Sequence, residues 1–125
     1  MFKKVKGLIA APYTPIKNNG EIDLNKIPLY AEKLKKDSLS GVFICGTTGE
    51  GMFLTNNERK KIAEEWVKYQ SDDFKIIVHV GTTSVVQSSD LANHAQKIGA
   101  FGTSSIGPIF LKPNDINDII DFCKI

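Results

Sequence analysis

Residues 42–51 read Val-Phe-Ile-Cys-Gly-Thr-Thr-Gly-Glu-Gly, an apolar run followed at once by a glycine-rich loop. Short apolar runs bounded by Gly or Pro are typical of strands buried on both faces of a parallel sheet. Similar runs occur at residues 8–11 and 76–80, and we expect a fourth strand at residues 102–109. The loop at residues 46–51 therefore comes directly after the second predicted strand.

Stretches with helical periodicity alternate with these runs. The first helix is expected to begin at Lys26, and a capping box at Thr55–Glu58 predicts the second. The third is expected to end at Gly99, and the fourth to open near Asn114 or Asp115. The apolar stripes are, in chain order, Ile27, Tyr30, Ala31 and Leu34; Ile62, Trp66 and Tyr69; Leu91, Ala95 and Ile98; and Ile116, Ile119, Ile120 and Cys123. This alternation predicts an α/β fold, one unit over residues 1–125 with four βα units of a parallel barrel.

Composition narrows the class of protein. Of 125 residues, 42% are apolar and 24% charged, which is ordinary for a globular domain. The net charge of +2 is scattered along the chain, so nucleic-acid binding gains no support. Cys45 and Cys123 lie far apart in sequence and are expected to be free thiols in a reducing cytosol. No signal peptide or membrane span is apparent, so we expect a cytoplasmic protein without a membrane partner.

The loop from Gly46 to Gly51 could bind a small anion. At the carboxyl end of a parallel strand it lies where βα loops build active sites. Its glycines are expected to permit tight turning, and its threonines to offer hydroxyl and amide donors. Its spacing, Gly-x-x-Gly-x-Gly, matches neither the dinucleotide fingerprint nor the phosphate-binding loop. The competing interpretation is a plain βα turn, since Gly and Thr are ordinary turn residues.

Several motifs occur together in order: Gly46-Thr47-Thr48-Gly49-Glu50, Leu54-Thr55, Glu58-Arg59 and His79-Val80-Gly81. In this combination the chain resembles the N-acetylneuraminate lyase and dihydrodipicolinate synthase superfamily, over nearly its whole length. The segments Glu64-Glu65-Trp66 and Phe110-Leu111-Lys112-Pro113 resemble the sialic-acid-cleaving branch. The synthase branch usually carries paired tyrosines where Ile109 and Phe110 stand, which disfavours a synthase.

The resemblance implies a partial (β/α)8 barrel and a class I aldolase. Such an enzyme cleaves N-acetylneuraminate to N-acetylmannosamine and pyruvate through a Schiff base, without metal or cofactor, commonly as a homotetramer. Thr47 and Thr48 match the positions that hold the pyruvate carboxylate, with Thr48 the strongest single candidate. Gly46, Gly49 and Glu50 are expected to support the loop, although Glu50 could equally be a plain surface carboxylate.

The resemblance also predicts that the catalytic residues are absent. The family's tyrosine and Schiff-base lysine lie on strands five and six, whereas this sequence covers four units and its last helical pattern shows no stop signal before Ile125. Neither Lys75 nor Lys112 is expected to replace the lysine. The chain is therefore expected to be inactive alone: a truncated product or incomplete gene model, a half barrel that pairs with a second half or with itself, or a non-catalytic keto-acid-binding or interaction protein.

Other polar residues are expected to be structural. His79 is interpreted as a hydrogen-bonded core residue, Cys45 and Tyr13 as packing residues, and His94 as facing solvent or a neighbouring helix. Residues 103–105 read Thr-Ser-Ser within the fourth predicted strand. Because buried hydroxyls without partners are costly, we expect this strand to weaken the fold.

Overall fold

The computed structural model, described for residues 4–108 and 112–124, contains a four-stranded sheet in the order β1-β2-β3-β4. The strands are β1 Ile9–Ala10, β2 Gly41–Ile44, β3 Lys75–His79 and β4 Gly102–Ser104. All three pairings are parallel, with Val42 of β2 between Ala10 of β1 and Ile76 of β3. The predicted α/β fold with parallel strands is confirmed, although β2 and β3 each begin one residue earlier than the apolar runs.

Four α-helices follow the strands: α1 Ile27–Lys36, α2 Asn56–Val67, α3 Val85–Lys97 and α4 Ile116–Lys124. Short 3-10 helices, η1 Leu24–Lys26 and η2 Gly51–Phe53, precede α1 and α2. The α2 start is the predicted capping box, because Thr55 Oγ1 accepts from the Glu58 amide and the Glu58 carboxylate accepts from the Thr55 amide. Gly99 follows α3 with a φ of 80°, the left-handed geometry expected there.

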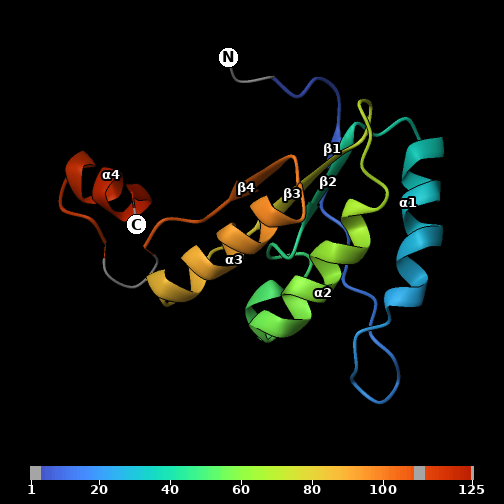
Figure 1. Ribbon diagram of the computed structural model, residues 1–125, viewed down its shortest axis with the longest axis horizontal. Helices are drawn as coiled ribbons and strands as arrows, with labels where there is room; N and C mark the ends of the chain where they lie inside the picture. The colour runs from blue at the N-terminus through green and yellow to red at the C-terminus, as the bar shows by residue number, and fades with distance from the viewer. Residues whose placement is uncertain (1–3, 109–111, 125) are drawn as a thin grey trace.

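The core lies between one face of the sheet and helices α1, α2 and α3, which Figure 1 shows arranged along that face. Val42 and Ile44 of β2 and Ile76 of β3 are at most 1% exposed, and Trp66 of α2 packs among them. Phe43, on the other face, is only half-buried. The sequence predicted burial on both faces, which is wrong within the described residues, because these helices cover only one of them.

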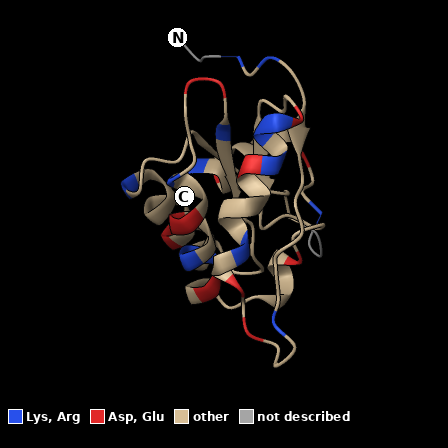
Figure 2. Ribbon diagram, turned by 90° about the vertical axis from the view of Figure 1, so that its right-hand side faces the viewer, with Lys and Arg blue, Asp and Glu red and all other residues tan. Residues whose placement is uncertain are grey.

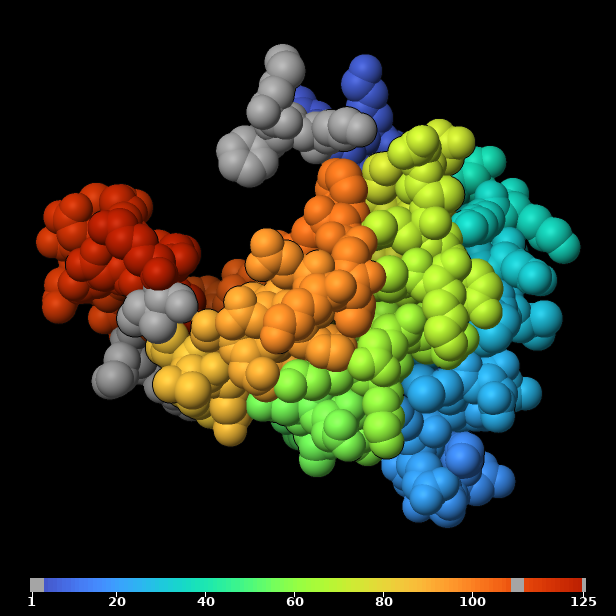
Figure 3. All heavy atoms as spheres, in the orientation of Figure 1, coloured from blue at the N-terminus to red at the C-terminus, as the bar shows by residue number. Residues whose placement is uncertain are grey.

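Helix α4 stands apart from the other helices. Figures 1 and 3 show it beyond β4, separated from the body formed by α1 to α3. Its predicted apolar face is present but uncovered among the described residues, with Ile116 64%, Ile119 37% and Ile120 43% exposed. The helix therefore gains little burial from the described part of the chain.

Strand β4 corrects two expectations. It spans only residues 102–104, and part of the predicted strand and of the motif at residues 110–113 lies outside the described residues. Thr103 and Ser105 are exposed and Ser104 is half-buried, so the expected penalty for buried hydroxyls is wrong. As the last strand in the sheet order, β4 has one side without a neighbouring strand among the described residues, which leaves these hydroxyls near water.

Charged side chains are distributed over the helices and loops. Figure 2 shows Lys and Arg segments interspersed with Asp and Glu segments, and several form local pairs such as Lys60–Asp90 at 2.7 Å and Lys68–Glu65 at 2.6 Å. These pairs are largely at the surface, where ion pairs contribute little to stability. Among the described helices, none combines the length and the apolar character that crossing a membrane requires.

Candidate functional site

The Gly46–Gly51 loop lies where the parallel topology places it, at the carboxyl end of β2. The neighbouring β3 runs in the same direction, so the segment that begins at Val80 opens at the same rim. Helix α2 starts after η2, which brings its first turn to the same end of the sheet. The loop, the first turn of α2 and the segment after β3 therefore lie at the same end of the sheet.

The loop is shaped by two residues in the left-handed region, and neither is a glycine. Cys45 has a φ of 57° and Glu50 a φ of 54°, whereas none of the three loop glycines has a positive φ. A left-handed conformation costs an L-residue about 1–2 kcal/mol. The expectation that these glycines permit the tight turn by their backbone freedom is therefore wrong.

The loop glycines are instead required by close packing. A Cβ on Gly46 would lie 2.4 Å from Phe43 Cε1, and one on Gly51 would lie 1.9 Å from the carbonyl oxygen of Cys45. Gly49 is buried, and its carbonyl accepts a 2.6 Å hydrogen bond from the Thr14 hydroxyl. The loop thus packs against β2 and the residue that follows it, and is hydrogen-bonded to the segment after β1.

Thr47 and Thr48 are exposed at the top of this loop. The turn closes through hydrogen bonds from the Glu50 amide to the Thr47 carbonyl, 3.0 Å, and from the Gly51 amide to the Gly46 carbonyl, 3.1 Å. Neither threonine amide donates a hydrogen bond to another of the described residues. Adjacent free amides and hydroxyls on a rigid turn are suited to binding an oxyanion such as a carboxylate.

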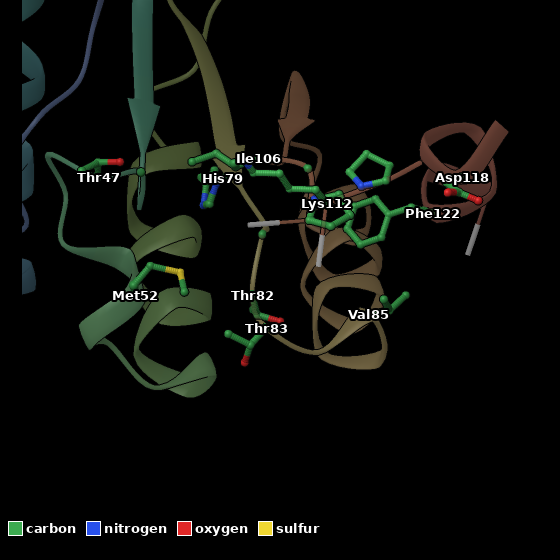
Figure 4. A pocket seen from close by; sticks show the side chains of 15 residues that line it. Thr47, Met52, His79, Thr82, Thr83, Val85, Ile106, Lys112, Asp118 and Phe122 are labelled. Atoms are coloured by element: carbon green, nitrogen blue, oxygen red, sulfur yellow. The ribbon is translucent and has the colours of Figure 1, made fainter. Parts of the chain in front are cut away.

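A cavity of about 550 Å³ opens beside the loop. Figure 4 shows Thr47, Met52 and His79 toward one side of the cavity and Lys112, Asp118 and Phe122 toward the other. Gly46 and Thr47 are among its lining residues, whereas Thr48 is exposed outside the lining. The volume is in the usual range for small-molecule sites.

A buried arginine joins α2 to the rim, and the sequence interpretation did not identify it as such. Arg59 is only 2% exposed; its Nη1 donates to the Gly81 carbonyl at 3.0 Å and its Nη2 to the His79 carbonyl at 2.6 Å. Nη2 also lies 3.4 Å from Nδ1 of His79. Arginine usually lies at the surface, and only the Glu58-Arg59 pair in the family motif singled this residue out in the sequence.

His79 is buried, as predicted, but it also lines the cavity. It is 4% exposed, its ring meets Phe43 edge-on at 5.8 Å, and its Nε2 has no hydrogen-bond partner among the described residues. Burial, and then the charge of Arg59, lower the pKa of His79, while the backbone of Cys45 acts weakly in the opposite direction. Because a guanidinium has only donors, its contact with Nδ1 favours the neutral ring protonated on Nε2.

Cys45 is a buried free thiol, as predicted, and Cys123 is an exposed one. Burial raises the pKa of Cys45 to about 11, against the opposing charge of Arg59. The thiolate is therefore almost absent at neutral pH, and Cys45 is unsuited to nucleophilic catalysis.

The segment after β3 is held rigidly as well. The Thr82 amide donates to Ser88 Oγ at 3.0 Å, and the Thr82 hydroxyl donates to the Ser84 carbonyl at 2.7 Å. Ser84 in turn caps α3, accepting from the Gln87 amide. These bonds fix the far wall of the cavity to α3.

The remaining candidates are placed as follows. Lys75 lies at the amino end of β3, away from the rim, and Lys112 is exposed at the cavity edge, so neither occupies a buried nucleophile position. Glu50 is exposed and gives η2 no side-chain cap, which fits the plain surface carboxylate better than a brace. His94 contacts the neighbouring helix through Glu64 at 3.1 Å, as one alternative predicted. Tyr13 is 70% exposed, so its packing role is wrong.

Curated relatives match almost the whole chain. N-acetylneuraminate lyase of Homo sapiens and N-acetylneuraminate lyase A of Xenopus laevis are each 44% identical over 124 residues, or 98% of this chain. The matched region is 39% of the human protein and 41% of the frog protein. The chain therefore spans about two fifths of the length of these relatives.

Solved structures agree with the sequence relatives. The chain superposes on N-acetylneuraminate lyase of Proteus mirabilis with a TM-score of 0.91 and 38% identity, covering 97% of this chain and 41% of that one. Dihydrodipicolinate synthase of Aquifex aeolicus gives 0.80 and 32%, covering 86% and 36%. The fold is accordingly a fragment of the (β/α)8 barrel of these enzymes. Residues 4–124 also match the model of the dihydrodipicolinate synthetase family, and the chain belongs to that family.

Proposed function

We propose that this chain carries the carboxylate-binding side of an N-acetylneuraminate lyase active site. The observation that supports it is the turn at Thr47 and Thr48, whose free amides and hydroxyls stand at the carboxyl rim beside a cavity of about 550 Å³. Relatives named N-acetylneuraminate lyase, at 44% identity, favour this substrate over that of a synthase. Pyruvate, or the corresponding end of open-chain N-acetylneuraminate, is the proposed ligand.

The proposed reaction requires an amine opposite this turn. The amine condenses with the 2-keto group and releases water, and the resulting iminium accepts the electron pair when the C3–C4 bond breaks. The C4 hydroxyl loses its proton as the bond breaks, and N-acetylmannosamine leaves as the aldehyde. The remaining enamine takes up a proton at C3 to give the iminium of pyruvate, and water hydrolyses this iminium to pyruvate and the free amine. In this scheme the turn holds the carboxylate through donors that are fixed before the ligand arrives.

The described residues offer no buried lysine at the rim for this role. Lys112, the lysine that lines the cavity, is exposed. We therefore propose that these 125 residues alone bind the keto acid without cleaving the sugar. Assembly as a homotetramer remains a prediction from the resemblance, and a cytoplasmic location remains a prediction from the sequence composition and its lack of a recognisable signal peptide.

Pyruvate titration of the purified chain tests the binding claim. Calorimetry or NMR should show saturable binding that is weakened in Thr48→Ala and restored in Thr48→Ser, because the serine keeps the hydroxyl. Thr103→Ala is the matched control: it removes the same atoms from an exposed strand residue outside the cavity lining. Absence of pyruvate binding, or equal weakening by both alanine variants, would contradict the proposal.

Borohydride trapping tests the second claim separately. The chain is incubated with N-acetylneuraminate or pyruvate and treated with borohydride, and its intact mass is then measured by mass spectrometry. We expect no covalent adduct, since the described part of the chain has no buried rim lysine. A stoichiometric adduct would show that an amine of this chain acts as the nucleophile.

A further inference from the structure

Arg59 carries a positive charge that the described part of the chain leaves without a counter-ion. The side chain is 98% buried, yet none of the ion pairs among residues 4–108 and 112–124 includes it. Two of its hydrogen bonds go to neutral carbonyls, those of His79 and Gly81, and its third contact is with the neutral Nδ1 of His79 at 3.4 Å. Its Nε has no hydrogen-bond partner among these residues. Buried charges are normally paired, so this one calls for an explanation.

The neighbouring titratable groups do not neutralise it. Cys45 lies close enough to respond to the charge of Arg59, but its buried thiol stays protonated. His79 faces Arg59 through Nδ1 at 3.4 Å and stays neutral, since burial and the arginine both oppose its protonation. The cluster of Cys45, Arg59 and His79 therefore carries a single positive charge. The other charged groups at the cavity, Lys112 and Asp118, come from the exposed segment around α4.

The charge of Arg59 is held against residues that border the proposed carboxylate site. Cys45 immediately precedes Gly46, and His79 lines the same cavity as Gly46 and Thr47. Arg59 also donates to the carbonyls of His79 and Gly81, two residues that line the same cavity. A charge held in a low-dielectric position acts on a nearby anion more strongly than one exposed to water.

We propose that Arg59 is a positioning residue for the anionic end of the ligand, and that a carboxylate bound at the Thr47–Thr48 turn is its counter-ion. Arg59 does not touch the ligand. It acts through its hydrogen bonds, which fix the end of β3, and through the electrostatic attraction of its charge across Cys45. The inference rests on the proposed keto-acid function and adds to it the reason that an anion is preferred over an uncharged ligand of the same shape.

The test compares pyruvate with methyl pyruvate, which has the same ketone but no charge. In the wild-type chain, pyruvate should bind more tightly. Arg59→Met should weaken pyruvate binding on the order of tenfold while changing methyl pyruvate binding far less, as expected for loss of one nearby charge. Lys112→Met is the matched control: it removes a positive charge from an exposed residue of the same cavity and should have a smaller effect.

A second variant separates charge from folding. Arg59→Lys keeps the charge but cannot reach both carbonyls in the arginine geometry. It should retain the preference for pyruvate over methyl pyruvate even if both affinities fall, and this variant decides the question if Arg59→Met does not fold. Loss of the preference in Arg59→Lys, or equal weakening of both ligands in Arg59→Met, would overturn the role of the charge.

Failure of the proposed function gives a different pattern. If wild-type chain binds neither ligand, the carboxylate site itself is wrong and the inference falls with it. If pyruvate binds and depends on Thr48 but Arg59→Met and Lys112→Met have the same small effect, the site stands and only the role of Arg59 is overturned.

Discussion

The substitution Gly51→Ala should distort the candidate site through one added methyl group. The new Cβ would lie 1.9 Å from the carbonyl oxygen of Cys45, whereas ordinary van der Waals contact begins near 3.4 Å. The atom it meets belongs to the backbone, so a side-chain rotation cannot relieve the overlap. Either the Cys45 peptide or the start of η2 must therefore move by more than an ångström. Overpacking of this kind typically costs about 1–3 kcal/mol.

Gly107→Ala provides the control for this substitution. A Cβ on Gly107 meets no other atom of the described residues within 4 Å, and the φ of Gly107 is not in the left-handed region. Both substitutions lower the conformational entropy of the unfolded chain by the same amount, and this effect alone stabilises the folded protein slightly. The difference between them therefore isolates the steric overlap at Gly51.

Urea unfolding followed by circular dichroism measures the effect. A loss of about 2 kcal/mol lowers the midpoint by about 1 M, given slopes of about 1–3 kcal/mol per M for small domains. Pyruvate affinity should fall as well, because the displaced turn carries Thr47 and Thr48. Equal midpoints for Gly51→Ala and Gly107→Ala, together with wild-type pyruvate affinity in Gly51→Ala, would refute the close-packing explanation of the loop.

Three further outcomes are expected. Thr14→Val should destabilise the chain by about 1–3 kcal/mol in urea unfolding, because it leaves the buried Gly49 carbonyl unpaired; Thr14→Ser, which keeps the hydroxyl, should not. Native protein at pH 8 should show one fast-alkylating thiol by mass spectrometry, Cys123, while Cys45 reacts only after denaturation; equal rates would contradict its burial. The pKa of His79 is lowered in the folded chain, so below about pH 6.5 the unfolded chain binds more protons than the folded one. The free energy of unfolding should therefore fall as the pH decreases through that value toward the native pKa, and His79→Gln should reduce this fall. The same pH dependence in the wild type and the variant would argue against the lowered pKa.

The sequence predicted the order and type of the elements because their signals are local. The capping box at Thr55 fixes the start of α2, and Gly99 marks the end of α3. The starts of β2 and β3 shifted by one residue, because pairing with a neighbouring strand decides them: Gly41 and Lys75 pair with each other although neither belongs to an apolar run. Local patterns do not contain that pairing.

Features that depend on tertiary contact were not predictable in the same way. The loop was identified, but the reason for its glycines was not, because the atoms they approach belong to Phe43 and to the Cys45 backbone. Arg59 appeared only as part of a motif, since burial of an arginine arises from the carbonyls it meets after folding. Exposure of Tyr13 likewise depends on which segments cover it.

The two left-handed residues that bracket the loop, Cys45 and Glu50, have one more consequence. Their unfavourable backbone conformations occur in a turn that the hydrogen bonds from the Glu50 and Gly51 amides close. Donor groups at the crest of such a turn are already oriented, so a ligand does not have to order them and their entropy is not lost again on binding. Association of a ligand with this turn should accordingly be fast, and its affinity should vary little with temperature, because the turn does not have to close around the ligand.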